Sequence, residues 1–223
     1  MGIEVEIANP QQPHVATVLL LDTSSSMEGF KIDQLNEGLI FFKEDVMNDE
    51  LARKRVDLAV ITFGQEVSVL KDFGPIDELN PPKLVANGLT PMGETILKAI
   101  NMVENRKNEY KAKGTDYYRP WIFMITDGEP TDMHSGDFMW NEVIRKIHEG
   151  EAQKKFAFFA VGVEPANMDI LKEIAPPNRI PLKLNQKKFK EMFEWLSKSQ
   201  AKVSSSNPGD QLALNNTNGW TTI

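Results

Sequence analysis

The chain has 223 residues, of which 41% are hydrophobic and 26% charged, with a formal net charge of −7 and no cysteine. This length and apolar content suit one globular domain with a large core, and the negative charge argues against a nucleic-acid-binding surface and against an anionic membrane face. The lack of cysteine excludes disulfides and thiolate metal sites.

The N-terminal stretch MGIEVEIANPQQPHV carries acidic residues where a signal peptide needs basic ones, and it has no long apolar core. No run of about 18 apolar residues occurs in the chain, so no segment is expected to span a membrane. We therefore expect a cytoplasmic protein.

Six short apolar runs predict the strands of a sheet. In chain order they are residues 15–22, 56–64, 67–74, 121–127, 156–163 and 180–184. The first, fourth and fifth runs are nearly continuous rather than alternating, which suits strands covered on both faces. The third run follows the second after only two residues, as expected of an antiparallel hairpin partner at the sheet edge.

Four segments repeat apolar residues at steps of three and four, which predicts amphipathic helices. Their apolar stripes are Ile32, Leu35, Leu39, Phe42 and Val46; Ile96, Ala99, Ile100 and Val103; Trp140, Val143, Ile144 and Ile147; and Phe189, Met192, Phe193 and Leu196. Alternation of these helices with the strands predicts a doubly wound α/β fold with helices on both faces. We expect a mostly parallel six-stranded sheet of order 3-2-1-4-5-6, with strand 3 antiparallel.

The C-terminal segment differs in composition from the rest of the chain. Residues 1–203 are expected to form the domain, whereas residues 204–223 are polar, rich in Ser and Asn, and interrupted by Pro208 and Gly209. A loose tail is one interpretation. Leu212, Leu214 and Trp220 are apolar enough that docking on the domain is the other.

Two predicted strands end in an acid, the first in Asp22 and the fourth in Asp127. In open α/β sheets, sites form at the carboxyl ends of the strands, near the point where the strand order reverses. If these strands are neighbours, about 4.8 Å apart, the two carboxylates repel unless a cation lies between them or one is protonated. This is the physical argument for a metal.

Hydroxyl side chains are the remaining candidate ligands. Ser24 and Ser26 alternate with Asp22 in the loop after the first strand, and Thr90 lies in a loop directly before a helix. Carboxylates and hydroxyls are hard oxygen donors, which suit Mg²⁺ best here, with Mn²⁺ and Ca²⁺ as alternatives.

Other polar residues are not expected to bind a metal. Ser25 falls between the alternating positions and is not expected to be a ligand, and Asp132 and His134 are expected to be solvated loop residues. His14 and His148 have no partner at a ligand spacing and are expected at the surface. The aromatic stretch DYYRPW at 116–121 resembles a stacking platform for single strands, but the negative charge favours core packing instead.

The three motifs DTSSS, LTPMG and TDGEPTD together resemble the metal-ion-dependent adhesion site of von Willebrand factor A domains. The stretches KIDQLNEGLIFFKEDV, VDLAVITFG, YYRPWIFMITDGEPTD and FKEMFEWLS and the closing GW are similar to the bacterial TerY-like branch, which is associated with tellurium resistance and chemical stress. The resemblance covers nearly the whole chain.

This resemblance implies a set of roles. The implied metal ligands are Asp22, Ser24, Ser26, Thr90 and Asp127. It implies a protein-binding module and not an enzyme, in which an Asp or Glu of a protein partner completes the metal shell. Partners implied by the family are kinase-like or phosphatase-like proteins and Ter-type stress proteins, with no nucleic acid and no membrane.

Two alternatives stay open. An Mg²⁺-dependent phosphohydrolase could use Asp22 as nucleophile, although Ser24 occupies the position where that chemistry places its general acid. In the third interpretation the chain is a chaperone-like or assembly subunit whose metal is purely structural, so that removing the ion would lower thermal stability.

Overall fold

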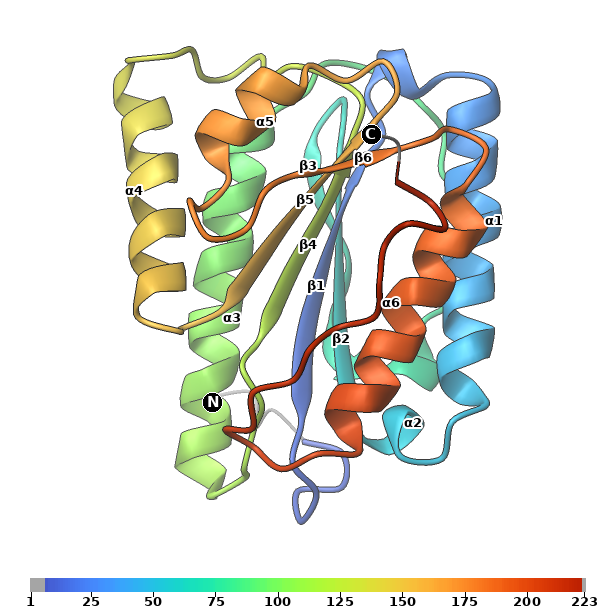
Figure 1. The fold of residues 1–223 in the computed structure, drawn as a ribbon, viewed down its shortest axis with the longest axis vertical. Helices are drawn as coiled ribbons and strands as arrows, with labels where there is room; N and C mark the ends of the chain where they lie inside the picture. Colours follow the sequence, from blue (N-terminus) through green and yellow to red (C-terminus); the bar gives the residue numbers. More distant parts are fainter. Residues whose placement is uncertain (1–6, 222–223) are drawn as a thin grey trace, which may run out of the picture.

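The computed structural model describes residues 7–221, and a six-stranded sheet forms its middle layer (Figure 1). The strands are β1 (Val15–Asp22), β2 (Val56–Phe63), β3 (Val67–Pro75), β4 (Trp121–Thr126), β5 (Ala157–Val163) and β6 (Leu182–Leu184). Their order is β3-β2-β1-β4-β5-β6, and β2 pairs with β3 antiparallel whereas the other pairs are parallel. The predicted order and the antiparallel third strand are confirmed.

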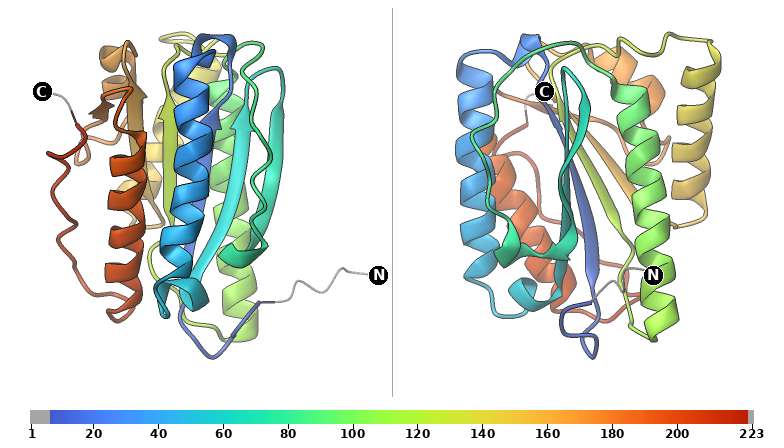
Figure 2. Two further views of the ribbon diagram at one scale, coloured as in Figure 1. Left: turned by 90° about the vertical axis from the view of Figure 1, so that its right-hand side faces the viewer. Right: turned by 180° about the vertical axis from the view of Figure 1, so that it is seen from behind.

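Helices cover both faces of the sheet (Figures 1 and 2). The helices are α1 (Phe30–Met47), α2 (Ala52–Arg55), α3 (Met92–Lys113), α4 (Phe138–Ala152), α5 (Met168–Ile174) and α6 (Phe189–Ser204), with 3-10 turns η1 (Ser25–Met27) and η2 (Ile76–Glu78). One face carries α1, α2 and α6, and the other carries α3, α4 and α5. No helix within residues 7–221 combines the length and the apolarity that a membrane crossing requires.

The sequence predicted the four long helices and missed two short ones. Helices α2 and α5 have four and seven residues, which is too short for an apolar stripe to repeat. Strand β6 begins at Leu182, two residues later than predicted. The reason is that Pro181 has no amide hydrogen to donate to a neighbouring strand, and Ile180 is 78% exposed.

The central strands are buried on both faces, which explains their continuous apolar sequences. Every residue of β1, β4 and β5 is buried. Along β1, Leu19 and Leu21 pack into the core under α1 and α6, whereas Val18 and Leu20 pack into the core under α3 and α4. Asp22 is the last residue of β1 and Thr126 the last residue of β4, so each of these strands ends in a polar side chain at the same edge of the sheet.

The tail after α6 runs back over the face that α6 covers (Figures 1 and 2). Trp220 is 3% exposed, and its ring lies edge-on to that of Trp195 at a centroid distance of 5.6 Å. The Trp195 indole donates to the Asn215 carbonyl at 2.8 Å, and Thr221 forms an antiparallel bridge to Leu184 of β6. These contacts attach the tail to the domain at its far end, while the division at residue 203 stays a prediction.

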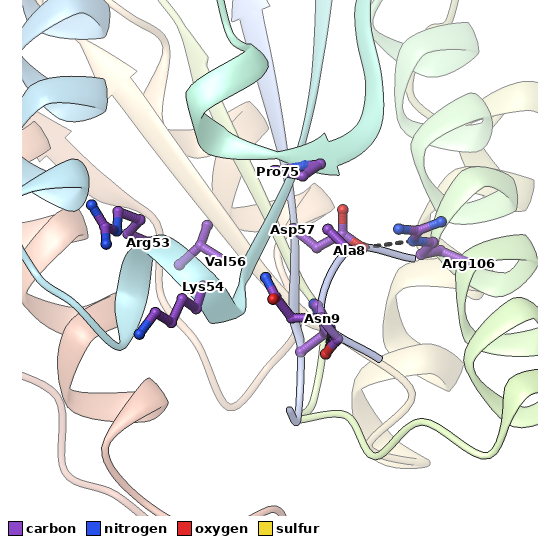
Figure 3. Close-up of a pocket in the computed structure, with 9 residues that line it drawn as sticks. Ala8, Asn9, Arg53, Lys54, Val56, Asp57, Pro75 and Arg106 are labelled. Atoms are coloured by element: carbon purple, nitrogen blue, oxygen red, sulfur yellow. Dashed lines mark hydrogen bonds and ion pairs between the residues drawn. The ribbon is translucent and has the colours of Figure 1, made fainter. Parts of the chain in front are cut away.

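A buried polar cluster lies near the start of β2, at the end of the sheet opposite the carboxyl ends of the parallel strands (Figure 3). The Arg106 guanidinium of α3 donates to Asp57 Oδ2 at 2.6 Å, and the Tyr110 hydroxyl donates to the same oxygen. Burial opposes the charge of Arg106, but the neighbouring carboxylate of Asp57 raises its pKa. An adjacent cavity of about 20 Å³ has room for one water molecule.

His14 belongs to this cluster, so its prediction as a surface residue is wrong. Its side chain is 3% exposed, and its ring stacks on Tyr110 at a centroid distance of 5.5 Å. Burial lowers its pKa. A single histidine before a strand gives no sequence signal for this position, because the stacking partner comes from the end of a distant helix.

Replacement of Asp57 by Asn should lower the free energy of unfolding by about 3–5 kcal/mol, because it leaves a buried guanidinium without its carboxylate. Both charged groups are nearly inaccessible, at 3% and 2% side-chain exposure. Glu109, the other partner of Arg106, is 32% exposed, so Glu109→Gln should cost less than about 1 kcal/mol. Urea unfolding of both variants measures the difference, and equal losses would contradict this ranking.

Candidate metal centre

The loop after β1 holds three of the predicted ligands. Asp22 is the last residue of β1 and is completely buried. The Ser24 backbone amide donates to Asp22 Oδ1 at 2.8 Å, which turns the chain over the edge of the sheet. The hydroxyl oxygens of Ser24 and Ser26 then lie 2.9 Å apart. The alternating spacing therefore brings three oxygen-bearing side chains to one place.

Asp127 reaches this place from the neighbouring strand. Strand β4 pairs with β1 with Leu21 opposite Ile125, so the residues that follow meet at the same edge. The Ser26 hydroxyl donates to Asp127 Oδ1 at 2.6 Å, and Asp127 is 7% exposed. The Ser24 amide on Asp22 and the hydroxyls of Ser24 and Ser26 thus connect the two predicted acids through the β1–α1 loop.

Thr90 belongs to the third loop, which leads into α3. Its amide donates to the Thr131 hydroxyl at 3.0 Å, and the Thr131 amide donates to the Thr90 carbonyl at 3.0 Å. Gly128 lies close to the hydroxyls of both Thr90 and Ser26. A Cβ at this position would lie 3.0 Å from Thr90 Oγ1 and 3.4 Å from Ser26 Oγ. The absence of a side chain at Gly128 leaves space between these oxygens.

One residue beside the predicted ligands, Thr126, was not predicted from the sequence. The Thr126 hydroxyl is buried and donates to Asp22 Oδ2 at 2.5 Å. Together with the Ser24 amide it fixes both oxygens of this carboxylate. Thr126 directly precedes Asp127, but only the register of β4 against β1 shows that it lies beside Asp22.

The other polar residues of these loops have different partners. The Asp132 carboxylate accepts from the backbone amides of Gly93 at 3.1 Å and Glu94 at 2.8 Å, so it caps the N-terminus of α3. The prediction of Asp132 as a merely solvated loop residue is therefore wrong. The side chain of His134 is 81% exposed, and Ser25 is also exposed.

The electrostatics of the site favour a bound cation. Burial raises the pKa of Asp22, hydrogen bonds from Ser24 and Thr126 oppose that rise, and the charge of Asp127 adds to it. The Lys31 ammonium, in the first turn of α1, forms an ion pair with Asp127 Oδ2. This ammonium supplies positive charge at one of the two predicted acids.

The donor set fits a hard divalent ion. It consists of two carboxylates and three hydroxyls, and no cluster of three or more His, Asp or Glu side chains occurs among residues 7–221 that could hold a metal by those groups alone. Oxygen donors of this kind suit Mg²⁺, Mn²⁺ or Ca²⁺ better than metals that prefer thiolate or imidazole ligands. Two negative charges would balance one divalent ion.

A doubly wound α/β domain with side-chain oxygens from three loops at one sheet edge belongs to the class of metal-dependent interaction domains. Residues 17–194 match the von Willebrand factor type A domain, and the chain belongs to this family. Domains of this family mediate protein–protein interactions and bind a divalent cation at the metal-ion-dependent adhesion site.

Known proteins similar to this chain are much longer or distant in sequence. The human inter-alpha-trypsin inhibitor heavy chain H6 is 24% identical over 172 residues, which cover 73% of this chain and 12% of that protein. The pilus adhesin SpaC from Lactobacillus rhamnosus GG has a TM-score of 0.65 at 13% identity, covering 86% of this chain and 30% of that chain.

A third similar protein is proximal thread matrix protein 1 from the mussel byssus. In the structure compared here, zinc occupies its metal-ion-dependent adhesion site (the MIDAS motif). Its TM-score is 0.54 at 19% identity, covering 85% of this chain and 48% of that chain. At these identities the solved structures support the fold alone.

Addition of Mg²⁺ at 100 times its dissociation constant should raise the free energy of unfolding by about 2.7 kcal/mol, because the folded site alone gathers the five oxygens. Ser24→Ala should lose this stabilisation, and Ser25→Ala should keep it. Urea unfolding with Mg²⁺ and with a chelator measures the effect. Equal behaviour of the two serine variants, or no stabilisation by Mg²⁺, Mn²⁺ or Ca²⁺, would remove the case for this site.

Asp22→Asn should be more stable than the unaltered chain in chelator at neutral pH. The folded-state pKa of Asp22 is raised above its ordinary value of 3.8, so the folded state loses stability as pH rises through that interval, and a neutral amide avoids the loss. The difference should shrink as pH falls toward 3.8. Urea midpoints across this pH range test the prediction, and a less stable variant at neutral pH would contradict it.

Proposed function

We propose that the chain is a metal-dependent protein-binding module. It would hold one divalent cation, with Mg²⁺ the first choice and Mn²⁺ or Ca²⁺ as alternatives, through Asp22, Ser24, Ser26, Thr90 and Asp127. When bound, the ion supplies an electrophilic position that an Asp or Glu of a protein partner can fill. The observation that carries the proposal is the convergence of these side-chain oxygens from three loops beside Gly128.

Exposed apolar side chains beside the site support a protein as the partner. Phe30 is 50% exposed, Leu89 68% and Phe138 86%. Phe30 directly precedes Lys31, Leu89 directly precedes Thr90, and Phe138 begins α4 after the loop that follows β4. Apolar groups next to a polar centre are typical of a protein contact surface, which excludes water around a central charged contact.

The sequence resemblance extends this proposal to a biological setting. The TerY-like stretches favour a bacterial tellurite or chemical stress-response system in the cytoplasm. Kinase-like or phosphatase-like proteins and Ter-type stress proteins would then be the partners, with no role for nucleic acid or a membrane. The zinc in the mussel protein's MIDAS motif adds Zn²⁺ to the ions worth testing.

A phosphohydrolase is the second candidate, and Lys31 is the observation that favours it. A lysine ammonium paired with Asp127 could also face a phosphoryl group. Against this, both oxygens of Asp22 already accept hydrogen bonds, and Ser24 stands where a general acid is required. We therefore propose an interaction module and not an enzyme.

Purification of the tagged chain from a tellurite-stressed bacterium that encodes it, with Mg²⁺ and again with chelator, tests the proposal. A partner should co-elute only with metal, should be lost with Ser24→Ala and should be retained with Ser25→Ala. Phe138→Ser should weaken partner binding while leaving the Mg²⁺ effect on unfolding unchanged.

Different results point to the alternatives. Mg²⁺-dependent hydrolysis of p-nitrophenyl phosphate that Asp22→Asn abolishes would establish the enzyme and overturn the module. Stabilisation by Mg²⁺ together with partner binding that is the same with and without chelator would instead make the ion purely structural.

A further inference from the structure

A large cavity lies at the end of the sheet opposite the metal site. Trp121 and Ala157, the first residues of β4 and β5, contribute to its lining, and the tail contributes Leu212 and Leu214. Its volume is about 770 Å³, within the range of pockets that hold small organic molecules. The cavity is thus bounded by the strand starts, by the C-terminal ends of α3 and α4, and by the tail.

Positive charge dominates this cavity although the chain carries a net charge of −7. Acidic side chains contribute only Glu104 and Asp210 among the described lining residues. The cationic lining residues are Lys107, Lys111, Arg119, Lys154, Lys155 and Arg179. A concentration of one sign in a concave site attracts the opposite charge.

Three of these cations have no carboxylate partner. Within residues 7–221, Lys111, Lys154 and Lys155 form no ion pair. By contrast, Arg119 and Arg179 share the buried carboxylate of Glu151, at 2.6 and 3.0 Å. That carboxylate balances one of the two guanidinium charges, so the cavity wall retains excess positive charge beyond the free lysines.

The rest of the lining combines apolar and aromatic residues with the polar side chains of Gln153, Ser206 and Gln211. Phe159 is 4% exposed and lies 4.3 Å beneath the Arg179 guanidinium, measured to the ring centroid. Leu212 and Leu214 of the tail add aliphatic surface opposite the lysines. Tyr118 and Trp121 are 4% and 5% exposed, so they form structure beneath the cavity and are not free to stack on bases of a nucleic-acid strand.

We propose that this cavity binds a small organic phosphate. Lysine ammonium groups act as point charges for phosphate oxygens, and the unpaired Lys111, Lys154 and Lys155 would supply them. Leu212 and Leu214 of the tail, and the Arg179 guanidinium that covers Phe159, would contact the organic part of the ligand. The site is independent of the metal centre, because its residues lie at the other end of the strands.

Isothermal titration of the full chain in chelator tests this site, with adenosine 5′-monophosphate, inorganic phosphate and citrate as probes. The nucleotide should bind more tightly than inorganic phosphate, because it also contacts the apolar walls. Lys154→Gln/Lys155→Gln should weaken nucleotide binding at least about tenfold. Asp210→Asn should strengthen it, because it removes an anion from the cavity.

The matched control is Lys83→Gln/Lys187→Gln, which removes two exposed lysines that do not line the cavity. This variant should change nucleotide affinity less than about twofold. No heat of binding for the nucleotide at millimolar concentration, an equal loss in the control variant, or citrate binding as tight as the nucleotide would each overturn the assignment.

Discussion

Mutual repulsion of two carboxylates at the ends of neighbouring parallel strands governs the chemistry of this domain. Parallel pairing of β1 and β4 makes the approach of Asp22 and Asp127 unavoidable. Burial leaves little water to screen their charges, and it raises the pKa of Asp22. A fold that holds these acids here therefore needs positive charge at the same edge, which the Lys31 ammonium provides in the described structure.

Hydrogen bonds among the loops prepare the site before any ion arrives. Thr126 and the Ser24 amide hold both oxygens of Asp22, and the reciprocal bonds between Thr90 and Thr131 tie two loops together. Such preorganisation means that little side-chain freedom is lost on binding. The same bonds use lone pairs that a metal would need, so metal binding would replace part of this hydrogen-bond network.

The two ends of the sheet differ in the charged and polar groups that they carry. The carboxyl ends of the strands present oxygen donors, whereas the amino ends carry the buried Asp57–Arg106 pair and the lysine-lined cavity. The continuous apolar strands between them separate these regions. The tail contributes Leu212 and Leu214 to the cavity wall, and Trp220 packs on Trp195 farther along it. The tail therefore runs from the amino ends of the strands toward their carboxyl ends.

From the sequence we predicted the strands and the four long helices, because burial and alternation leave direct marks on residue type. Periodicity alone does not fix the strand order, which the structure confirms, and the five oxygen-bearing residues stay a prediction as metal ligands. The sequence did not determine the roles of Thr126, Asp132 or His14, because each depends on a partner distant in the chain. The tertiary structure also created the cavity, since its lysines come from α3 and the turn after α4. Local patterns record what a residue buries, whereas strand register and helix placement decide which distant groups it meets.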